Sequence, residues 1–275
     1  MSEGWRVGSA SLTRRCCFAV LTGLALGAMP AHAAESACRI AEDAAGGSVA
    51  GVVDERTLRL TDGTEIRLAG LESLADLAAP AMAGAWAAGA KAALERLALG
   101  KTIAVQPLGE DRFGRRMALV AGPGDAGSLL QERLIGQGHG LVSARIGDPS
   151  CRSRFQAAER AARSAGLGLW SDRPHLIYRA DRPDPLSAVR GRFALVEGTV
   201  VSVNDRGATV YVNFGRRWSE DFTVTIPKRS ERLFAAAGAA PKSFEGRRVR
   251  VRGHVEERGG PMIEAVRPEQ IEFAE

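Results

Sequence analysis

Residues 66–73 read Ile-Arg-Leu-Ala-Gly-Leu-Glu-Ser, and residues 111–115 read Asp-Arg-Phe-Gly-Arg. Each is a strand-like stretch that presents an arginine: Arg67 is the second residue of the first stretch, and Arg115 is the last residue of the second. Upstream, residues 52–58 read Val-Val-Asp-Glu-Arg-Thr-Leu, and downstream a helix-like stretch closes on Gly-Leu-Gly-Leu-Trp at residues 166–170. The order and spacing of these four stretches decide which fold we expect for the N-terminal part of the chain.

In this order and spacing, the four stretches resemble the thermonuclease (staphylococcal nuclease-like) family, over residues 47–171. The resemblance implies a mainly β fold with helices (α+β), in which a five-stranded nuclease-type OB barrel carries three helices. It also implies calcium-dependent hydrolysis of phosphodiesters by one carboxylate base and two arginines. The arginines fall on Arg67 and Arg115, which are the candidate catalytic residues. A guanidinium suits this role because it stays ionised and binds two phosphate oxygens at once.

The metal ligands of the family are only partly present. The family motif Asp-Gly-Asp-Thr reads Asp-Glu-Arg-Thr at residues 54–57, so that Arg56 replaces a metal-binding aspartate. The candidate metal ligands that remain are Asp54 and Glu72, and Ca²⁺ is the cofactor that the resemblance implies. Calcium prefers carboxylate and carbonyl oxygens, so a cationic side chain at this position predicts an impaired metal site.

The catalytic base of the family has no counterpart in register. The proline and glutamate of the family motif fall on Leu74 and Ala75, and the nearest carboxylate, Asp76, is one residue out of register. A catalytic group has to be held within about 0.5 Å of its productive position. The sequence therefore predicts a nuclease fold in which metal-dependent hydrolysis is weakened or lost.

Two interpretations of Arg56 remain open. Its guanidinium could take the place of the cation and bind a phosphate without a metal. Alternatively, it could form an ion pair with Glu72 or Asp54 and fill an inactive site.

The first 33 residues are typical of a secretion signal. Arg14 and Arg15 precede an apolar run at residues 16–29, and Ala-His-Ala at residues 31–33 is a small-x-small cleavage site. The run is too short for a membrane span, and no later segment is apolar enough to form one. We therefore predict an exported protein, periplasmic or extracellular after cleavage near Ala33.

The charge balance predicts that nucleic acid binds weakly. The chain carries 37 Lys and Arg and 32 Asp and Glu, a formal net charge of +5, and loss of residues 1–33 removes three arginines and one glutamate, leaving +3. Proteins that depend on phosphate contacts are usually more basic than this. We expect weak binding, of single strands, at physiological salt.

Four cysteines are present, and Cys16 and Cys17 leave with the signal. Cys38 and Cys151 remain as an even pair in an oxidising compartment, which predicts one disulfide. A catalytic or metal-binding pair is the alternative, but no histidine motif accompanies these cysteines.

Local patterns divide the mature chain into two domains and a linker. Within the thermonuclease-like domain, residues 34–171, strands are expected at 48–60, 64–71, 102–106 and 116–120 and helices at 80–99, 128–135 and 150–164. Prolines and scattered charges at residues 172–190 predict the linker. Residues 191–275 are expected to form a C-terminal five-stranded OB-like barrel with a helix between the third and fourth strands. This part looks like the C-terminal module of some secreted thermonuclease-like proteins.

One expected strand of the C-terminal domain carries basic residues at alternate positions, 248, 250, 252 and 254, which places them on one strand face. OB-folds that bind single strands combine such a basic track with stacking aromatic residues. The alternative is a solvated outer face without a ligand. The candidate nucleic-acid-binding residues of the whole chain are Arg56, Arg248, Arg250, Arg252, Tyr211 and Trp218.

Three functions are compatible with these patterns. The first is an exported protein that binds nucleic-acid phosphodiesters with little or no hydrolysis. The second is an active calcium-dependent nuclease with a rearranged carboxylate site that uses Glu72 and Asp76. The third is an envelope protein-binding module without a nucleic-acid role. No motif identifies a protein partner.

Overall fold

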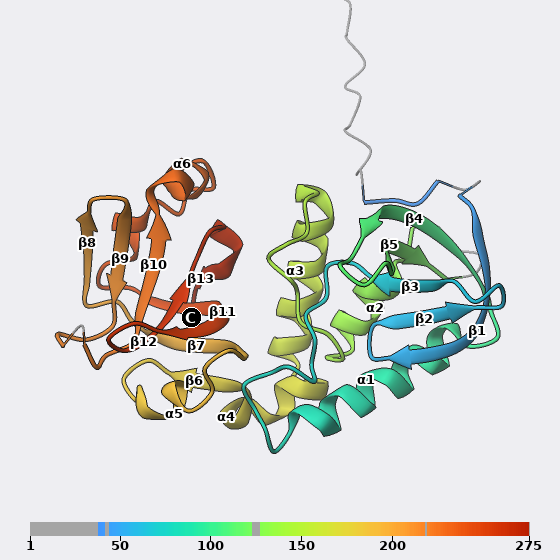
Figure 1. Cartoon of the computed structure of the whole chain (residues 1–275), viewed down its shortest axis with the longest axis horizontal. Helices are drawn as coiled ribbons and strands as arrows, with labels where there is room; N and C mark the ends of the chain where they lie inside the picture. The colour runs from blue at the N-terminus through green and yellow to red at the C-terminus, as the bar shows by residue number, and fades with distance from the viewer. Residues whose placement is uncertain (1–37, 42–43, 123–126, 218, 275) are drawn as a thin grey trace, which may run out of the picture. The chain divides into compact units, whose positions relative to one another are not determined.

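Figure 1 shows the computed structural model of the chain, which describes residues 38–41, 44–122, 127–217 and 219–274. The predicted signal, residues 1–33, lies outside these ranges. No helix among the described residues is long and apolar enough to cross a membrane. The described residues all belong to one compact unit.

The N-terminal part forms a closed barrel with the strand order β1-β2-β3-β5-β4. Strands β3 and β5 are parallel, and the other neighbours are antiparallel. Apolar residues that alternate along β2 and β3 fill its interior, as the hairpin pattern predicts: Leu58, Leu60, Ile66 and Leu68 are buried. The five-stranded barrel is thus confirmed. Its strands are β1 (Gly46–Asp54), β2 (Thr57–Leu60), β3 (Glu65–Leu68), β4 (Thr102–Glu110) and β5 (Arg116–Ala121).

A turn interrupts the strand that the sequence pattern predicts as continuous over residues 48–60. The break falls at Glu55 and Arg56, between β1 and β2. Its cause is local, because the Oδ1 atom of Asp54 accepts the backbone N–H of Arg56 at 2.9 Å and stabilises a tight turn. The turn places Arg56 at the end of the barrel instead of on a strand.

Three helices accompany the barrel: α1 (Ala83–Ala98), α2 (Leu130–Gly136) and α3 (Pro149–Ser164). Helix α1 packs against β1, α2 packs against β5, and α3 packs against α2. Helix α3 begins at Asp148, whose carboxylate accepts the backbone N–H groups of Ser150 at 2.7 Å and Cys151 at 3.1 Å. This cap satisfies donors that have no partner within the helix.

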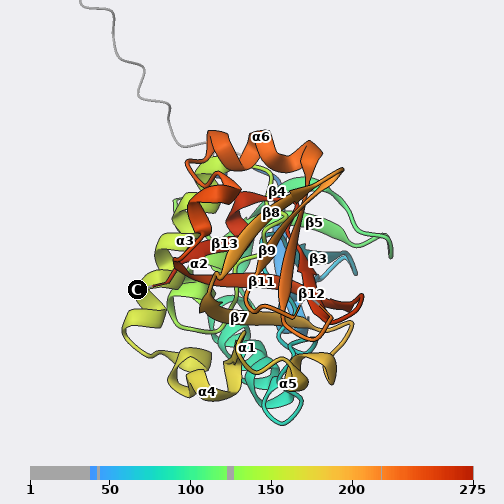
Figure 2. The same ribbon diagram turned by 90° about the vertical axis from the view of Figure 1, so that its left-hand side faces the viewer.

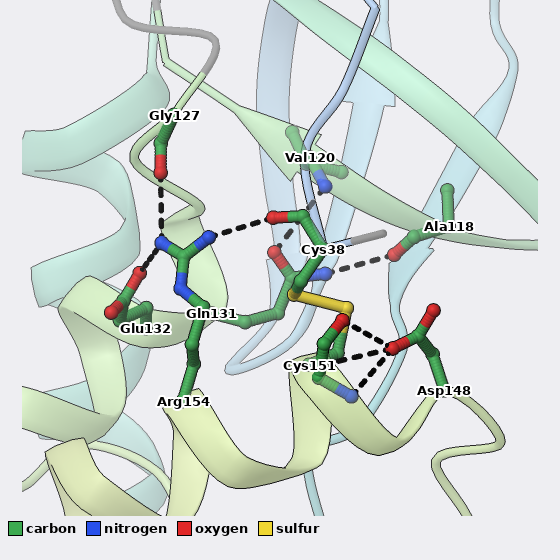
Figure 3. The surroundings of a disulfide bond; sticks show 10 residues. Cys38, Ala118, Val120, Gly127, Gln131, Glu132, Asp148, Cys151 and Arg154 are labelled. Carbon is green, nitrogen blue, oxygen red and sulfur yellow. Dashed lines mark hydrogen bonds and ion pairs between the residues drawn. A yellow bond between two sulfur atoms is a disulfide. The ribbon is translucent and has the colours of Figure 1, made fainter. Parts of the chain in front are cut away.

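The predicted disulfide between Cys38 and Cys151 is confirmed, with the two Cα atoms 4.7 Å apart (Figure 3). Arg154, one turn further along α3, donates to the carbonyl oxygen of Cys38 at 2.7 Å and pairs with Glu132 of α2. Buried Gln131 donates to the carbonyl oxygen of Ala118 in β5 at 2.9 Å. The N-terminal segment, two helices and the barrel are therefore joined within one region.

The segment predicted as a linker is folded. A 3₁₀ turn (Gly168–Asp172) leads into it, and it contains the elements α4 (Arg173–Leu176), β6 (Ile177–Arg179) and α5 (Asp184–Ser187). Strand β6 pairs in parallel with β7, and Ala180 and Leu186 are buried in the C-terminal core. Burial of these apolar residues, which lie between the prolines, makes the segment part of the C-terminal sheet.

The C-terminal part is a second sheet with the order β6-β7-β11-β12-β10-β9-β8 (Figures 1 and 2). Strands β8, β9, β10, β12 and β11 repeat the order of the N-terminal barrel, and β10 and β12 are again the parallel pair. Only two residues separate β7 from β8, so one bent stretch of chain links these two strands. Its elements are β7 (Phe193–Thr199), β8 (Ser202–Arg206), β9 (Thr209–Asn213), β10 (Thr223–Pro227), α6 (Lys228–Ala236), β11 (Arg248–Glu257), β12 (Pro261–Glu264) and β13 (Ile271–Phe273).

Candidate functional site

Three arginines gather at one end of the N-terminal barrel. Arg67 lies on β3, Arg56 on the β1–β2 turn and Arg115 on the β4–β5 turn. Burial lowers the pKa of Arg67, and the positive charges of Arg56 and Arg115 lower it further. The side chains of Arg56, Arg67 and Arg115 are only 15%, 12% and 23% exposed. The structure therefore brings together the two candidate catalytic arginines and adds Arg56 to them.

Asp54 connects two of these arginines. Its Oδ2 atom lies 3.6 Å from the Nη1 atom of Arg67, while Oδ1 accepts the backbone N–H of Arg56. Arg67 also donates to the hydroxyl of Thr57 at 3.3 Å. The carboxylate of Asp54 thus pairs with the Arg67 side chain and fixes the backbone at Arg56, with both of its oxygens engaged.

The guanidinium of Arg56 turns toward the segment that follows β3. Its Nη1 atom donates to the carbonyl oxygen of Leu71 at 2.8 Å. Its Nε–H is buried and has no hydrogen-bond partner among the described residues; the nearest carboxylate, that of Glu55, is 3.9 Å away. Glu55 instead accepts a hydrogen bond from the Ser73 hydroxyl at 3.1 Å. Arg56 is therefore held through its Nη1 atom, and its Nε–H is shielded from solvent.

Arg115 is held by Asp111, four residues earlier. The Oδ2 atom of Asp111 lies 2.8 Å from Nε and 2.7 Å from Nη2 of Arg115. Its Oδ1 atom accepts the backbone N–H groups of Phe113 and Arg115, which fixes the turn. The ring of Phe113, 66% exposed, lies between the guanidinium groups of Arg112 and Arg115, at 4.8 and 5.1 Å from its centroid.

These residues do not fit a calcium ion. Both oxygens of Asp54 are engaged, and the carbonyl of Leu71 accepts from Arg56. The described ranges contain no group of three or more His, Cys, Asp or Glu residues that could hold a metal. The positive charge of Arg56 also disfavours a cation beside it. The arrangement suits an anion instead, because guanidinium groups donate to phosphate oxygens.

The two remaining carboxylate candidates form no hydrogen bond or ion pair with the three arginines among the described residues. The backbone N–H of Glu72 donates to Leu141 at 2.9 Å, and its carboxylate makes no hydrogen bond or ion pair within the described part of the chain. Asp76 is exposed, and its carbonyl accepts the N–H of Phe193 in β7 at 3.2 Å. Within the described residues, neither carboxylate is therefore paired with Arg67 or Arg115.

The structure buries Arg250 and Arg252, which are candidate nucleic-acid-binding residues by sequence. Their side chains are only 5% and 4% exposed and are paired with carboxylates. Arg252 binds both oxygens of Glu159 in α3, at 3.2 and 2.7 Å, and the carbonyl of Val142 at 3.0 Å. Alternation correctly places the two arginines on one strand face, but residues of the N-terminal domain cover Arg252, and Glu197 and Glu272 pair with Arg250. Arg248, on the same face, is 58% exposed and pairs with Glu197 at 3.0 Å.

Glu272 of β13 completes this buried network and makes its contribution to folding stability depend on pH. Burial alone would raise the pKa of Glu272, but the charges of Arg252 and Arg163 and a hydrogen bond from Arg250 more than offset burial, so the pKa lies below its ordinary value of 4.5. Arg163 and Arg250 approach the carboxylate to 2.9 and 2.8 Å. Because the pKa of Glu272 is lower in the folded state, its ionised form stabilises the protein at pH values above the unfolded-state pKa. This contribution is lost as the pH falls through the folded-state pKa.

We expect Glu272→Gln to flatten the decrease in unfolding free energy below pH 4.5, because glutamine cannot take up the proton. Urea unfolding at a series of pH values on both sides of this point measures the slope. Glu257→Gln, an exposed change on β11, is the control and should leave the slope unchanged. An unaltered slope in Glu272→Gln would show that other carboxylates govern acid unfolding.

The aromatic candidates have different outcomes. Tyr211 is half-buried on β9 and belongs to a groove on the C-terminal sheet, away from the Arg250–Arg252 network. Trp218 lies outside the described residues.

Two functional carboxylates were not predicted from the sequence. The first is Asp111, although its place in the motif at residues 111–115, four residues before an arginine, is a usable signal. The second is Glu159, for which no local signal exists.

Comparison with known protein families finds a match over most of the N-terminal barrel. Residues 65–172 match the family model described as Staphylococcal nuclease homologue. The match includes Arg67 and Arg115, whereas Asp54 and Arg56 precede it. No curated protein matches the chain. Residues 65–172 therefore form a domain of the staphylococcal nuclease homologue family.

Proposed function

We propose that the N-terminal barrel binds the phosphodiester backbone of single-stranded nucleic acid through Arg56, Arg67 and Arg115. The observation that carries this proposal is the gathering of three part-buried guanidinium groups at one end of the barrel. Guanidinium groups donate charge-assisted hydrogen bonds to phosphate oxygens. A bound phosphate would also offset the repulsion among the three charges.

Hydrolysis at this site is weakened or lost. Metal-dependent cleavage requires an ion that activates water or stabilises the leaving oxygens, and Arg56 occupies the surroundings that such an ion would need. The base position holds Ala75, and Asp76 is engaged through its backbone with β7. The chain therefore keeps groups that bind a phosphodiester and lacks the group that would activate water.

Export belongs to the same proposal. The basic, apolar and small-x-small order of residues 14–33 is that of a secretion signal. The disulfide between Cys38 and Cys151 is stable in an oxidising compartment. The protein would act in the periplasm or outside the cell.

Binding is tested by fluorescence anisotropy of a labelled single-stranded DNA with the mature chain. Arg67→Ala and Arg115→Ala should each weaken binding about 10- to 150-fold, because each removes charge-assisted hydrogen bonds to phosphate. Arg59→Ala is the matched control, since it removes the same charge from an exposed side chain on neighbouring β2, paired with Glu65 at 2.9 Å. Affinity should fall as salt rises.

The two alternatives predict different results. We expect little or no cleavage of the same DNA with calcium or with a chelator, and binding that does not depend on calcium. Robust calcium-dependent cleavage that Arg67→Ala abolishes would establish the nuclease instead. Binding unaffected by any of the arginine variants, or no binding at all, would favour an envelope module without a nucleic-acid role.

A further inference from the structure

A groove of about 840 Å³ lies on the C-terminal sheet, over β8, β9, β10 and β12. Along β9, Val210 and Val212 are buried in the core, whereas Thr209, Tyr211 and Asn213 line the groove. Figure 2 shows β8, β9 and β12 within this sheet. The volume is in the upper part of the range of about 300–1,000 Å³ that is typical of ligand sites.

The floor of the groove combines an aromatic ring with small polar groups. Tyr211 is half-buried, and its hydroxyl makes no hydrogen bond within the described ranges. Asn213 donates to the hydroxyl of Ser202 at 3.2 Å, and Thr223 donates to Asn213 at 3.5 Å. Met262 contributes an apolar surface beside them. Such a floor can accept a flat ring and satisfy polar groups at its edge.

The rim is positively charged. Four exposed arginines and only two acidic residues line it: Arg206, Arg216, Arg229, Arg258, Asp221 and Glu264. Arg206 and Arg216 form no ion pair within the described part of the chain. The other two form exposed pairs at 3.8 Å (Arg229 with Glu264) and 3.4 Å (Arg258 with Glu256). Exposed pairs of this kind contribute little free energy, so these arginines can exchange their partners for a ligand.

We propose that this groove binds a short stretch of single-stranded nucleic acid, with a base stacked on Tyr211 and phosphates on the rim arginines. Proteins that bind single strands combine an aromatic platform with a positively charged groove, and both features are present here. A duplex would not offer an unstacked base face to Tyr211. This site is separate from the arginine cluster of the N-terminal barrel and goes beyond the function proposed for it.

The experiment uses the full mature chain carrying Arg67→Ala and Arg115→Ala, so that binding at the first site does not conceal the second. A labelled thymidine oligonucleotide is titrated into this protein and followed by anisotropy. Adding Tyr211→Ala should weaken binding about 5- to 150-fold, whereas Tyr211→Phe, which keeps the ring, should retain it. Adding Arg206→Ala with Arg216→Ala should lower the slope of log affinity against log salt by about 1.4.

Arg182→Ala is the control, because it removes one exposed arginine from the segment between β6 and α5, outside the groove, and should leave affinity unchanged. Circular dichroism checks that each variant is folded. Absence of binding in the starting protein, or groove variants that bind as tightly as it does, would overturn the proposal without affecting the first site. Equal binding of a duplex or a sulfated polysaccharide, with no effect of Tyr211→Ala, would identify a general polyanion site and also overturn it. Loss of binding in the groove variants supports the proposal even if Arg67 proves unimportant.

Discussion

Replacing Arg252 by alanine is expected to lower the free energy of unfolding by about 3–5 kcal/mol, because it leaves the carboxylate of Glu159 buried without its partner. Burial alone would lower the pKa of Arg252, yet the charge and hydrogen bonds of Glu159 raise it above its ordinary value. The guanidinium is therefore charged in the folded protein, and its pairing with Glu159 offsets the cost of burying it. Urea unfolding of the mature chain measures the loss.

Two variants control this experiment. Arg248→Ala removes an exposed arginine from the same strand, and we expect it to cost less than about 1 kcal/mol. Arg252→Met together with Glu159→Leu replaces the buried pair by apolar groups, which is often close to neutral. A loss in Arg252→Ala no greater than that in Arg248→Ala would mean that the buried pair contributes little.

The pair has a further consequence for the arginine cluster. Arg252 donates to the carbonyl of Val142, and the N–H of Val142 donates to Glu159 at 2.9 Å. Val142 forms an isolated bridge with Leu71, whose carbonyl holds Arg56. The C-terminal barrel therefore supports the segment on which the position of Arg56 depends.

Loss of the disulfide is expected to lower the free energy of unfolding by up to about 4.7 kcal/mol in the chain-entropy model, which gives this value for a loop of about 100 residues. Cys38 and Cys151 are 113 residues apart, so the cross-link restricts a large part of the unfolded chain. Urea unfolding of the oxidised protein and of Cys38→Ser with Cys151→Ser measures the difference.

The reduced wild-type protein is the matched control, since it keeps both side chains and loses only the bond. Both cysteines are fully buried, so the serine variants carry an additional cost of burying hydroxyl groups. Two free thiols titrated in the natively exported protein, or equal stability of its oxidised and reduced forms, would contradict the prediction.

Much of the N-terminal fold could be predicted from local sequence. The Thr-Asp-Gly turn at residues 61–63 joins two strands with alternating apolar residues, and in the structure Gly63 has a φ of 86° while Asp62 accepts the N–H of Thr64 at 2.8 Å. Turn chemistry and the two-residue period of a strand depend on neighbours in the chain, so the sequence alone suffices for them. The cysteine count likewise predicted the disulfide. The break at Arg56 escaped the strand pattern because it depends on one Asp54 hydrogen bond.

The composition of the site depended on tertiary contacts. Alternation placed Arg250 and Arg252 on one face but could not reveal that Glu159, more than 90 residues earlier, lies against that face. The same limit applies to Arg56, whose partner is a backbone carbonyl, and to the rim of the groove, which four arginines from a strand, a helix and two loops line. The sequence by itself determined which residues share a strand face and which cysteines can pair. Only the tertiary structure decided which charges are buried and which remain available to a ligand, because burial depends on the element that covers a face.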